Sequence, residues 1–211
     1  DRLLLDQLQE EPQLRTNAGS CYRLGVETAY YDRAIQAMEV YSQGLAIQPD
    51  HFWCRFGLGR IQAKQGRLAE ARTALAAAAT LAPADPYLLW DFTQDLVSVG
   101  LPDRAVGSAQ TLVGLDPNYW GNWQLLSKAL LASGKPDAAV EALRSAVAHS
   151  PISLSPDVQL GDLLRELGRT EEAALVYQAM STRGDRGKSR ANRDLLRIAA
   201  SRLTGLGVRR S

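Results

Sequence analysis

The sequence predicts an all-α protein, an α-solenoid of tandem helix-turn-helix hairpins. Three observations predict this class: a 34-residue period, apolar residues spaced three to four apart within each period, and glycine or proline at constant places between the apolar runs. Apolar residues at this spacing indicate amphipathic helices, and glycine and proline interrupt them. One such hairpin cannot bury its apolar faces alone, so several must stack on one another.

The period starts at residue 18 and continues without insertion through five units. Position 20 of each unit is alanine: Ala37, Ala71, Ala105, Ala139 and Ala173. Position 32 is proline in the first four units: Pro49, Pro83, Pro117 and Pro151. Position 15 is glycine in all units but the first, which has Asp32: Gly66, Gly100, Gly134 and Gly168. A large apolar residue at position 7 precedes a small or hydroxylated residue at position 8, so the two helices of a hairpin can approach closely.

Each unit is expected to hold two antiparallel helices, one before the residue at position 15 and one that ends before position 32. Pro102 and Pro136 stand at position 17, where the first turn of a helix tolerates a missing N–H. The expected repeats are residues 18–51, 52–85, 86–119, 120–153 and 154–187.

Two further segments flank the repeats. Residues 1–17, with Leu3, Leu4, Leu5 and Leu8, are expected to form an N-terminal cap helix or the remnant of a further repeat. Residues 188–211 are expected to form a basic C-terminal capping helix and tail, because a repeat array needs a solvated outer face at its end. The helix itself is predicted over residues 190–203. Its apolar side carries Leu196, Ala199, Ala200 and Leu203, and its basic side carries Arg190, Arg193 and Arg197.

This pattern resembles the tetratricopeptide repeat, with Leu-Gly at positions 7 and 8, Gly at 15, Ala at 20, an aromatic residue or Leu at 24, Ala at 27 and Pro at 32. The fourth unit is the best match: Trp123, Leu126, Leu130, Gly134, Ala139, Leu143, Ala146 and Pro151. The resemblance covers residues 18–185 and implies a right-handed superhelix of five units. It also implies that the first helices line a concave groove for a peptide or a helix of a partner protein.

The groove positions of that family place six aromatic side chains on the first helices of the first three units. The candidate partner-binding residues are Tyr22, Arg23, Tyr30, Trp53, Phe56, Arg60, Tyr87, Trp90, Asp91 and Gln94, with Val26 and Lys64 at neighbouring groove positions. Aromatic side chains dominate binding hot spots, so this cluster is the expected docking surface. The alternative is that several rings form the core between adjacent first helices. In the last two units the same positions are polar and of mixed sign, which is typical of a solvated face.

The carboxylate clamp of heat-shock chaperone adaptors, a known subgroup of the family, is not expected here. That clamp needs basic and asparagine side chains at set groove positions. The first three units place Tyr22, Val26, Gly57, Tyr87 and Asp91 there instead.

Composition argues against catalysis and metal binding. The sequence has two histidines, His51 and His149, far apart and both expected at the surface, and two cysteines, Cys21 and Cys54, without a CxxC spacing. The cysteines are interpreted as small packing residues. We therefore expect no enzyme, no catalytic residue, no metal, no cofactor and no small-molecule substrate.

Charge is uneven along the chain. Residues 1–180 carry 15 basic and 21 acidic residues, whereas residues 181–211 carry nine basic and two acidic ones. The basic tail permits binding to nucleic acid or anionic lipid, but no aromatic residue is interleaved in it for base stacking, so nucleic acid is disfavoured. The excess of arginine over lysine hints at a bacterial source.

The sequence thus predicts a non-catalytic protein–protein interaction scaffold that binds a partner in its aromatic groove. The alternative is a self-associating, homo-oligomeric module of a larger bacterial envelope, polysaccharide or glycosyltransferase assembly. No apolar run is long enough to span a bilayer. A soluble cytoplasmic protein is favoured, with export or membrane association as part of a longer chain left open. The chain opens at Asp1 without methionine, so a processed or excised piece is expected.

Overall fold

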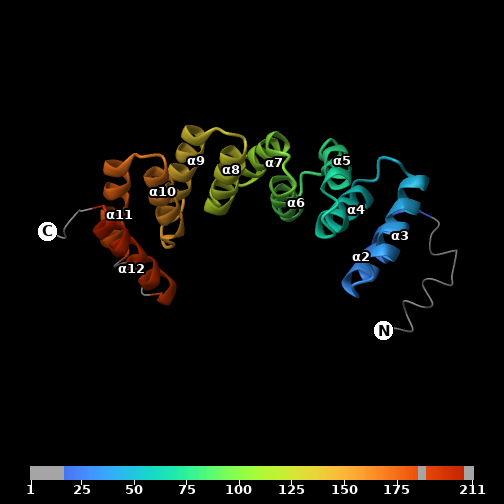
Figure 1. Ribbon diagram of the computed structural model, residues 1–211, viewed down its shortest axis with the longest axis horizontal. Coiled ribbons are helices and arrows are strands. Elements are labelled where there is room, and N and C mark those ends of the chain that lie inside the picture. Colours follow the sequence, from blue (N-terminus) through green and yellow to red (C-terminus); the bar gives the residue numbers. More distant parts are fainter. Residues whose placement is uncertain (1–16, 185–188, 207–211) are drawn as a thin grey trace. The chain divides into compact units, whose positions relative to one another are not determined.

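The structure, a computed structural model, describes residues 17–184 and 189–206. Within these residues it contains eleven helices and no strand (Figure 1). The chain divides into two compact bodies, an N-terminal body of residues 1–104 and a C-terminal body of residues 105–211, and each is described by itself. The N-terminal cap expected over residues 1–17 falls almost wholly outside the described residues, as does most of the loop before the last helix.

The N-terminal body contains α2 (Ala18–Tyr30), α3 (Ala34–Ile47), α4 (Phe52–Lys64), α5 (Leu68–Ala79) and α6 (Pro86–Ser98). Helix α7 (Pro102–Leu115) begins at its end and continues into the C-terminal body. The C-terminal body continues with α8 (Trp120–Ala132), α9 (Pro136–Ala148), α10 (Ser155–Glu166), α11 (Thr170–Gly184) and α12 (Arg190–Gly205). Helices α2 and α3, α4 and α5, α8 and α9, and α10 and α11 pack as hairpins.

Side chains at the residue before a helix satisfy free N–H groups of several first turns. Asn17 accepts a hydrogen bond from the Ser20 N–H at 2.9 Å, and Asp85 accepts one from the Leu88 N–H at 2.8 Å. His51, which the sequence placed in a surface loop, accepts the Cys54 N–H on its Nδ1 at 3.3 Å and so caps α4. Such caps define where a helix begins.

The turn inside each hairpin depends on a residue with positive φ at position 15. The four glycines there have φ between 71° and 79°, and Asp32 has φ 58°. In all five turns the N–H of the next residue donates to the carbonyl five residues earlier, as Lys135 does to Leu130 at 2.9 Å. This bond ends the first helix and needs the left-handed conformation that glycine adopts without strain.

Two glycine-to-alanine substitutions in the C-terminal body test this requirement. A Cβ on Gly134 or on Gly107 would meet no atom within 4 Å, but only Gly134 has a positive φ, of 71°. Gly134→Ala should therefore lower the free energy of unfolding by about 1–2 kcal/mol. Gly107→Ala, inside α7, should raise it by about 0.5–1 kcal/mol. Guanidinium denaturation of both variants measures the difference. A change in the free energy of unfolding with the same sign in both variants would contradict this explanation of the turn.

Alanine at position 20 and the side chain at position 24 form the contact between the two helices of a hairpin. All five position-20 alanines are fully buried. A Cβ on Gly161 would lie 2.4 Å from the Tyr177 ring, and one on Gly59 would lie 2.7 Å from Leu75. The small residue at position 8 therefore leaves the space that the position-24 side chain fills.

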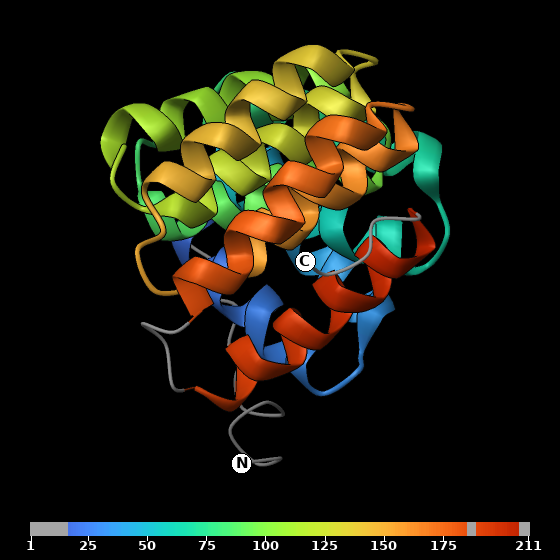
Figure 2. The same cartoon turned by 90° about the vertical axis from the view of Figure 1, so that its left-hand side faces the viewer.

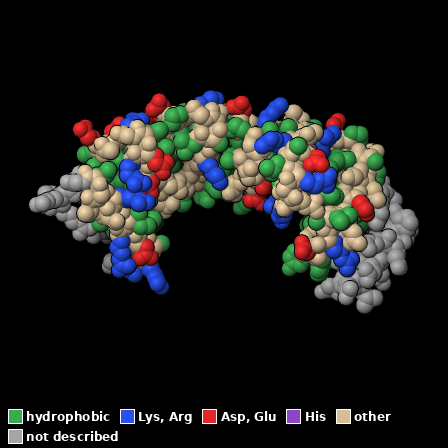
Figure 3. Space-filling view, in the orientation of Figure 1, with side chains coloured by type: hydrophobic (Ala, Val, Ile, Leu, Met, Phe, Trp, Pro, Cys, Tyr) green, Lys and Arg blue, Asp and Glu red, His purple; other side chains and the backbone are tan. Residues whose placement is uncertain are grey.

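Helix α12 packs against α11 and α10 within the C-terminal body, and Figure 2 shows α12 beside α11. Its Asn192 is buried and donates to the Ile152 carbonyl at 2.7 Å, and Arg202 pairs with Asp162 of α10 at 2.9 Å. The predicted sides of the helix are confirmed. Leu196, Ala199, Ala200 and Leu203 are buried or partly buried, and Arg190, Arg193 and Arg197 are exposed. Basic side chains gather at this end of the C-terminal body in Figure 3.

Candidate functional site

A cleft lies between α2 and α4, the first helices of the first two hairpins, which contact each other directly. Tyr41 of α3 is wedged between them. A Cβ on Gly25 would lie 2.3 Å from its ring and a Cβ on Gly57 2.4 Å from it, so only glycine fits at either place. The buried Tyr41 ring therefore packs against both helices at these glycines and lines the cleft.

The cleft has a volume of about 330 Å³. Its lining comes from one side of α2, one side of α4 and the Tyr41 ring. The lining residues are Tyr22, Val26, Ala29, Tyr30, Tyr41, Phe56, Gly57, Arg60, Ile61 and Lys64. Four of the ten sequence-predicted site residues are among them: Tyr22, Tyr30, Phe56 and Arg60. Eight of the ten lining side chains are uncharged and no carboxylate is among them, so the cleft suits an apolar group beside a positive edge.

Ring contacts hold the wall of the cleft in place. The centroid of Tyr22 lies 5.2 Å from that of Trp53 and 6.2 Å from that of Tyr41. Burial raises the pKa of the Tyr22 hydroxyl above its ordinary value, although Arg60 acts in the opposite direction. Both tyrosines are therefore neutral at physiological pH, since burial also raises the pKa of Tyr41.

Phe56 is not the projecting side chain that the groove pattern predicted. It is 5% exposed, and its ring centroid lies 5.6 Å from that of Phe52 and 5.3 Å from that of Phe92. Phe56 therefore joins the core between α4 and α6, although it also belongs to the cleft lining. The alternative interpretation of these rings as core is correct for this residue, because an apolar ring between two packed helices is stabilised by leaving water.

Arg60 is committed to contacts within the chain. Its Nε lies 3.0 Å from Oδ2 of Asp95 on α6, and its guanidinium carbon lies 5.2 Å from the centroid of Phe56. Burial raises the pKa of Asp95 above its ordinary value and nearby Asp91 adds to the rise, whereas Arg60 and Lys64 oppose it. Lys64, one turn further along α4, has no carboxylate within ion-pair distance among the described residues.

The remaining predicted residues lie outside the cleft lining. Arg23 is exposed on α2, and Trp53 is partly buried against Tyr22. The α6 residues Tyr87, Trp90, Asp91 and Gln94 have the spacing of one helix face. Tyr87 is 89% exposed and Asp91 is exposed, whereas Trp90 and Gln94 are partly buried. The α6 residues therefore lie outside the cleft lining, although they belong to the same body.

Sequence reasoning missed three features of this site. Tyr41 stands at position 24 of the first unit and was not among the candidate site residues, and the signal that could have revealed its role is the pair of glycines, Gly25 and Gly57, that contact its ring. Ile61 lines the cleft, and Asp95 holds Arg60. Asp95 stands one turn after Asp91 on α6, but only packing determines which of the two reaches Arg60.

The groove positions on the first helices of the last two repeats are less solvated than their polar sequence suggested. Asp162 of α10 accepts a hydrogen bond from the Tyr177 hydroxyl at 2.7 Å and pairs with Arg202 of α12. Arg165 lies 3.6 Å from the same carboxylate. Burial raises the pKa of Tyr177, and the hydrogen bond to Asp162 adds to the rise. These charges hold α10, α11 and α12 together.

The cysteines are packing residues, as the sequence indicated. Both are buried, and the Cys54 Sγ donates to the Ala18 carbonyl at 3.4 Å. Burial, together with Cys21, raises the pKa of Cys54 to about 12, so its thiol is neutral at physiological pH. Reactive cysteines are thiolates, which this environment disfavours.

The histidines also have structural contacts. His51 caps α4, as described above. His149 stacks on Trp123 with 6.0 Å between the ring centroids. Within the part of the chain that the structure describes, no three His, Cys, Asp or Glu side chains are grouped to hold a metal ion.

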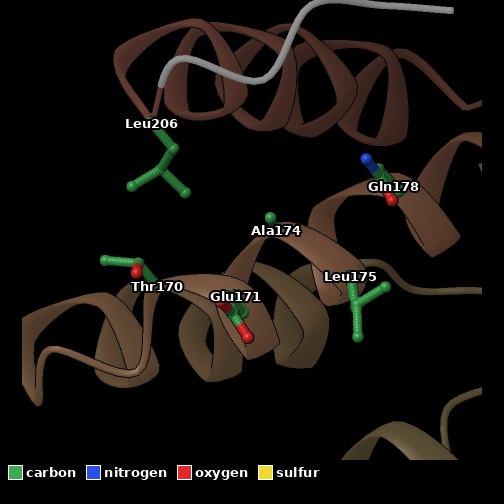
Figure 4. A pocket seen from close by; sticks show the side chains of 6 residues that line it. All are labelled: Thr170, Glu171, Ala174, Leu175, Gln178 and Leu206. Atoms are coloured by element: carbon green, nitrogen blue, oxygen red, sulfur yellow. The ribbon is translucent and has the colours of Figure 1, made fainter.

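A second depression, of about 400 Å³, lies between α11 and the end of α12 (Figure 4). Thr170, Glu171, Ala174, Leu175, Gln178 and Leu206 line it. It contains one charged side chain and no aromatic ring, so it offers less to a partner than the cleft between α2 and α4.

These features define a class of protein, an all-α solenoid of tandem helical hairpins with an aromatic cleft between two of its first helices. Family models of the tetratricopeptide repeat match residues 31–89, 94–151 and 124–189. The chain belongs to the tetratricopeptide repeat family. A search of curated proteins finds no significant match.

Solved structures of other proteins show the same fold. The chain is similar to MamA, residues 41 to the end, from Desulfovibrio magneticus RS-1, with a TM-score of 0.60 and 15% identity over 82% of this chain and 97% of that one. It is also similar to YrrB, which is described as a tetratricopeptide repeat protein with an unusual peptide-binding site. The TM-score is 0.63 and the identity 16%, over 82% of this chain and 89% of YrrB. Among the described residues, none of the helices combines the length and the apolar character needed to cross a bilayer.

Proposed function

We propose that this chain is a non-catalytic scaffold that binds a segment of a partner protein in the cleft between α2 and α4. The proposed binding residues are Tyr22 and Tyr30 in the cleft, with Arg23, Trp53, Tyr87, Trp90, Asp91 and Gln94 on the neighbouring surface. Phe56 and Arg60 belong to the lining, where contacts within the chain hold them. The observation that carries the proposal is a cleft of about 330 Å³ that is lined by four aromatic rings and open to solvent.

The cleft favours binding because its rings are already ordered. Tyr22 and Tyr41 are held by ring contacts and by the two glycines beside Tyr41, so they lose little conformational entropy when a partner binds. Tyr30 is 83% exposed and would bury most of its ring under an incoming side chain. Aromatic anchors of this kind dominate the energetics of protein interfaces.

Family membership supports the proposal in general terms, since proteins of this family typically bind other proteins. The description of YrrB as having a peptide-binding site points in the same direction. Self-association is the competing function, because the same exposed apolar side chains, Val26, Tyr30 and Tyr87, could meet a second copy of the chain.

Tyr30→Ala tests the proposed site. Because Tyr30 is exposed, its loss should leave the fold intact, which circular dichroism would verify. We expect this variant to bind peptides selected on an array by the unaltered chain at least about tenfold more weakly, since a hot-spot side chain is worth 2 kcal/mol or more. Fluorescence anisotropy measures the affinity. The matched control is Tyr119→Ala, which removes an exposed tyrosine from the C-terminal body.

Two outcomes would overturn the proposal. One is an unchanged affinity for every selected peptide in the Tyr30→Ala variant. The other is a dimer in sedimentation experiments at micromolar concentration that the same substitution dissociates, because that result would assign the face to self-association.

A further inference from the structure

The charges around the cleft select which partner segment fits it. We propose, on the basis of the proposed function, that the cleft binds an extended segment with two features: a bulky apolar side chain that contacts Tyr41, and an Asp or Glu side chain that pairs with Lys64. Lys64 rather than Arg60 is then the residue that recognises the acidic group.

An extended segment fits because α2 and α4 are in direct contact. A helix is about 10 Å across with its side chains, too wide to lie between two helices that touch each other. A single apolar side chain can instead enter the cleft, whose lining includes Val26, Ile61 and the Tyr41 ring. The surrounding rings remove that side chain from water, which provides the anchor.

Arg60 is not available for a partner. Its guanidinium already pairs with Asp95 and lies over the Phe56 ring. To bind a second carboxylate, it would have to leave a half-buried partner or place two carboxylates beside each other. Arg60, one of the candidate partner-binding residues, is therefore occupied by an ion pair within the chain.

Lys64 remains as the positive charge without an ion pair at the edge of the cleft. No carboxylate lies among the lining residues, and none of the described residues places one within ion-pair distance of Lys64. Asp95 balances the Arg60 charge, and Asp91 and Lys64 are close enough to Asp95 for their charges to interact with it. Neither carboxylate forms an ion pair with Lys64 among the described residues, so an acidic group on the occupant supplies the partner that Lys64 lacks.

The spacing of the two features follows from α4. Lys64 stands seven residues after Gly57, which contacts the Tyr41 ring, so the two positions are about 10 Å apart along the helix axis. An extended chain advances about 3.3 Å per residue. The acidic residue is therefore expected about three residues from the apolar anchor, on the side that leads toward the C-terminal end of α4.

Selection of displayed peptides tests this inference without knowledge of the natural partner. A library of random 12-residue peptides, fused at the C-terminus so that no terminal carboxylate is free, is selected on the full chain and on its Lys64→Glu variant. The full chain should enrich an apolar residue with Asp or Glu about three positions away. Lys64→Glu should keep the apolar residue and exchange the acid for Lys or Arg. Lys128→Glu, the same charge change at an exposed position of the C-terminal body, should enrich the same peptides as the full chain.

Affinity measurements then test the ion pair between Lys64 and the acidic side chain of the peptide. In the selected peptide, acid-to-amide replacement should weaken binding to the full chain about fivefold at low salt and much less at high salt, because exposed ion pairs are screened. The same replacement in the peptide should have no effect on its affinity for the Lys64→Gln variant, which lacks the charge and retains a polar side chain.

The outcomes separate this inference from the proposed function. Enrichment of apolar anchors without an acid, or with an acid that Lys64→Glu does not change, overturns the role of Lys64 and leaves the binding cleft standing. A separate set of synthetic peptides has free C-termini. If binding requires the terminal carboxylate, Lys64 does not recognise an Asp or Glu side chain, and this inference is wrong. If no selected peptide loses affinity in the Tyr30→Ala variant, the cleft is not the binding site and both proposals fail.

Discussion

Phe92→Ala is expected to lower the free energy of unfolding by about 3–5 kcal/mol, the range for removing a large aromatic side chain from a packed core. Phe92 is fully buried in α6, and its ring meets Phe52 at 5.5 Å and Phe56 at 5.3 Å between centroids, both edge-on. Its loss leaves a cavity and removes two aromatic contacts. The same cluster supports the wall of the cleft through Phe56, so peptide binding should weaken as well.

Guanidinium denaturation followed by circular dichroism measures this effect. Tyr87→Ala is the matched control on the same helix, because Tyr87 is 89% exposed and its loss should change stability by less than about 0.5 kcal/mol. Since the chain forms two compact bodies, the two bodies can unfold in separate transitions. In that case only the unfolding transition of the N-terminal body should shift to a lower guanidinium concentration. A loss below about 1 kcal/mol would show that the Phe52, Phe56 and Phe92 cluster is not a core.

The second large effect is expected at the C-terminal body, where Gly161→Val should cost about 3 kcal/mol. A Cβ at this position would lie 2.4 Å from the Tyr177 ring, and two further methyl groups would add to the clash. The ring must then move, which breaks its hydrogen bond to Asp162 and disturbs the pairing of Asp162 with Arg202. Inserted volume in a packed core costs up to about 3 kcal/mol.

The matched control for this prediction is Gly107→Val, because a Cβ at Gly107 meets no atom within 4 Å. That variant should change the free energy of unfolding by less than about 0.5 kcal/mol, since glycine and valine are both modest helix formers. A Gly161→Val, Tyr177→Ala double variant should lose less stability than the sum of the two single variants, because the clash disappears with the ring. Strict additivity would indicate that Gly161 and Tyr177 do not share this space.

The sequence alone was sufficient to predict the fold class and the family. The alanines at position 20 and the glycines at position 15 recur in register because each has a local cause: a close helix crossing at one position and a positive φ at the other. Asp32 shows that this local rule tolerates an exception, since its turn has the same hydrogen bond with φ 58°. Periodicity also predicted the two sides of α12 correctly, because the burial of a helix face depends on spacing that is visible along the chain.

The candidate site was predictable only in part. The groove positions led to Tyr22, Tyr30, Phe56 and Arg60, and all four line the cleft. They could not show that Phe56 faces Phe92 or that Arg60 is held by Asp95, because each of these contacts joins two residues more than 30 positions apart in the chain. A spacing rule assigns a residue to a helix face, whereas the distance and angle between neighbouring helices decide whether that face is core or surface.

The sequence by itself therefore determined the repeat length, the hairpins and the helix faces, all of which follow from backbone preferences and from the 3.6-residue period of a single helix. Only the tertiary structure decided that Tyr41 packs against both α2 and α4, that Arg60 is paired within the chain, and that Lys64 remains without an ion-pair partner among the described residues. The physical reason is that ion pairs and ring contacts act over a few ångströms and depend on how each pair of helices packs.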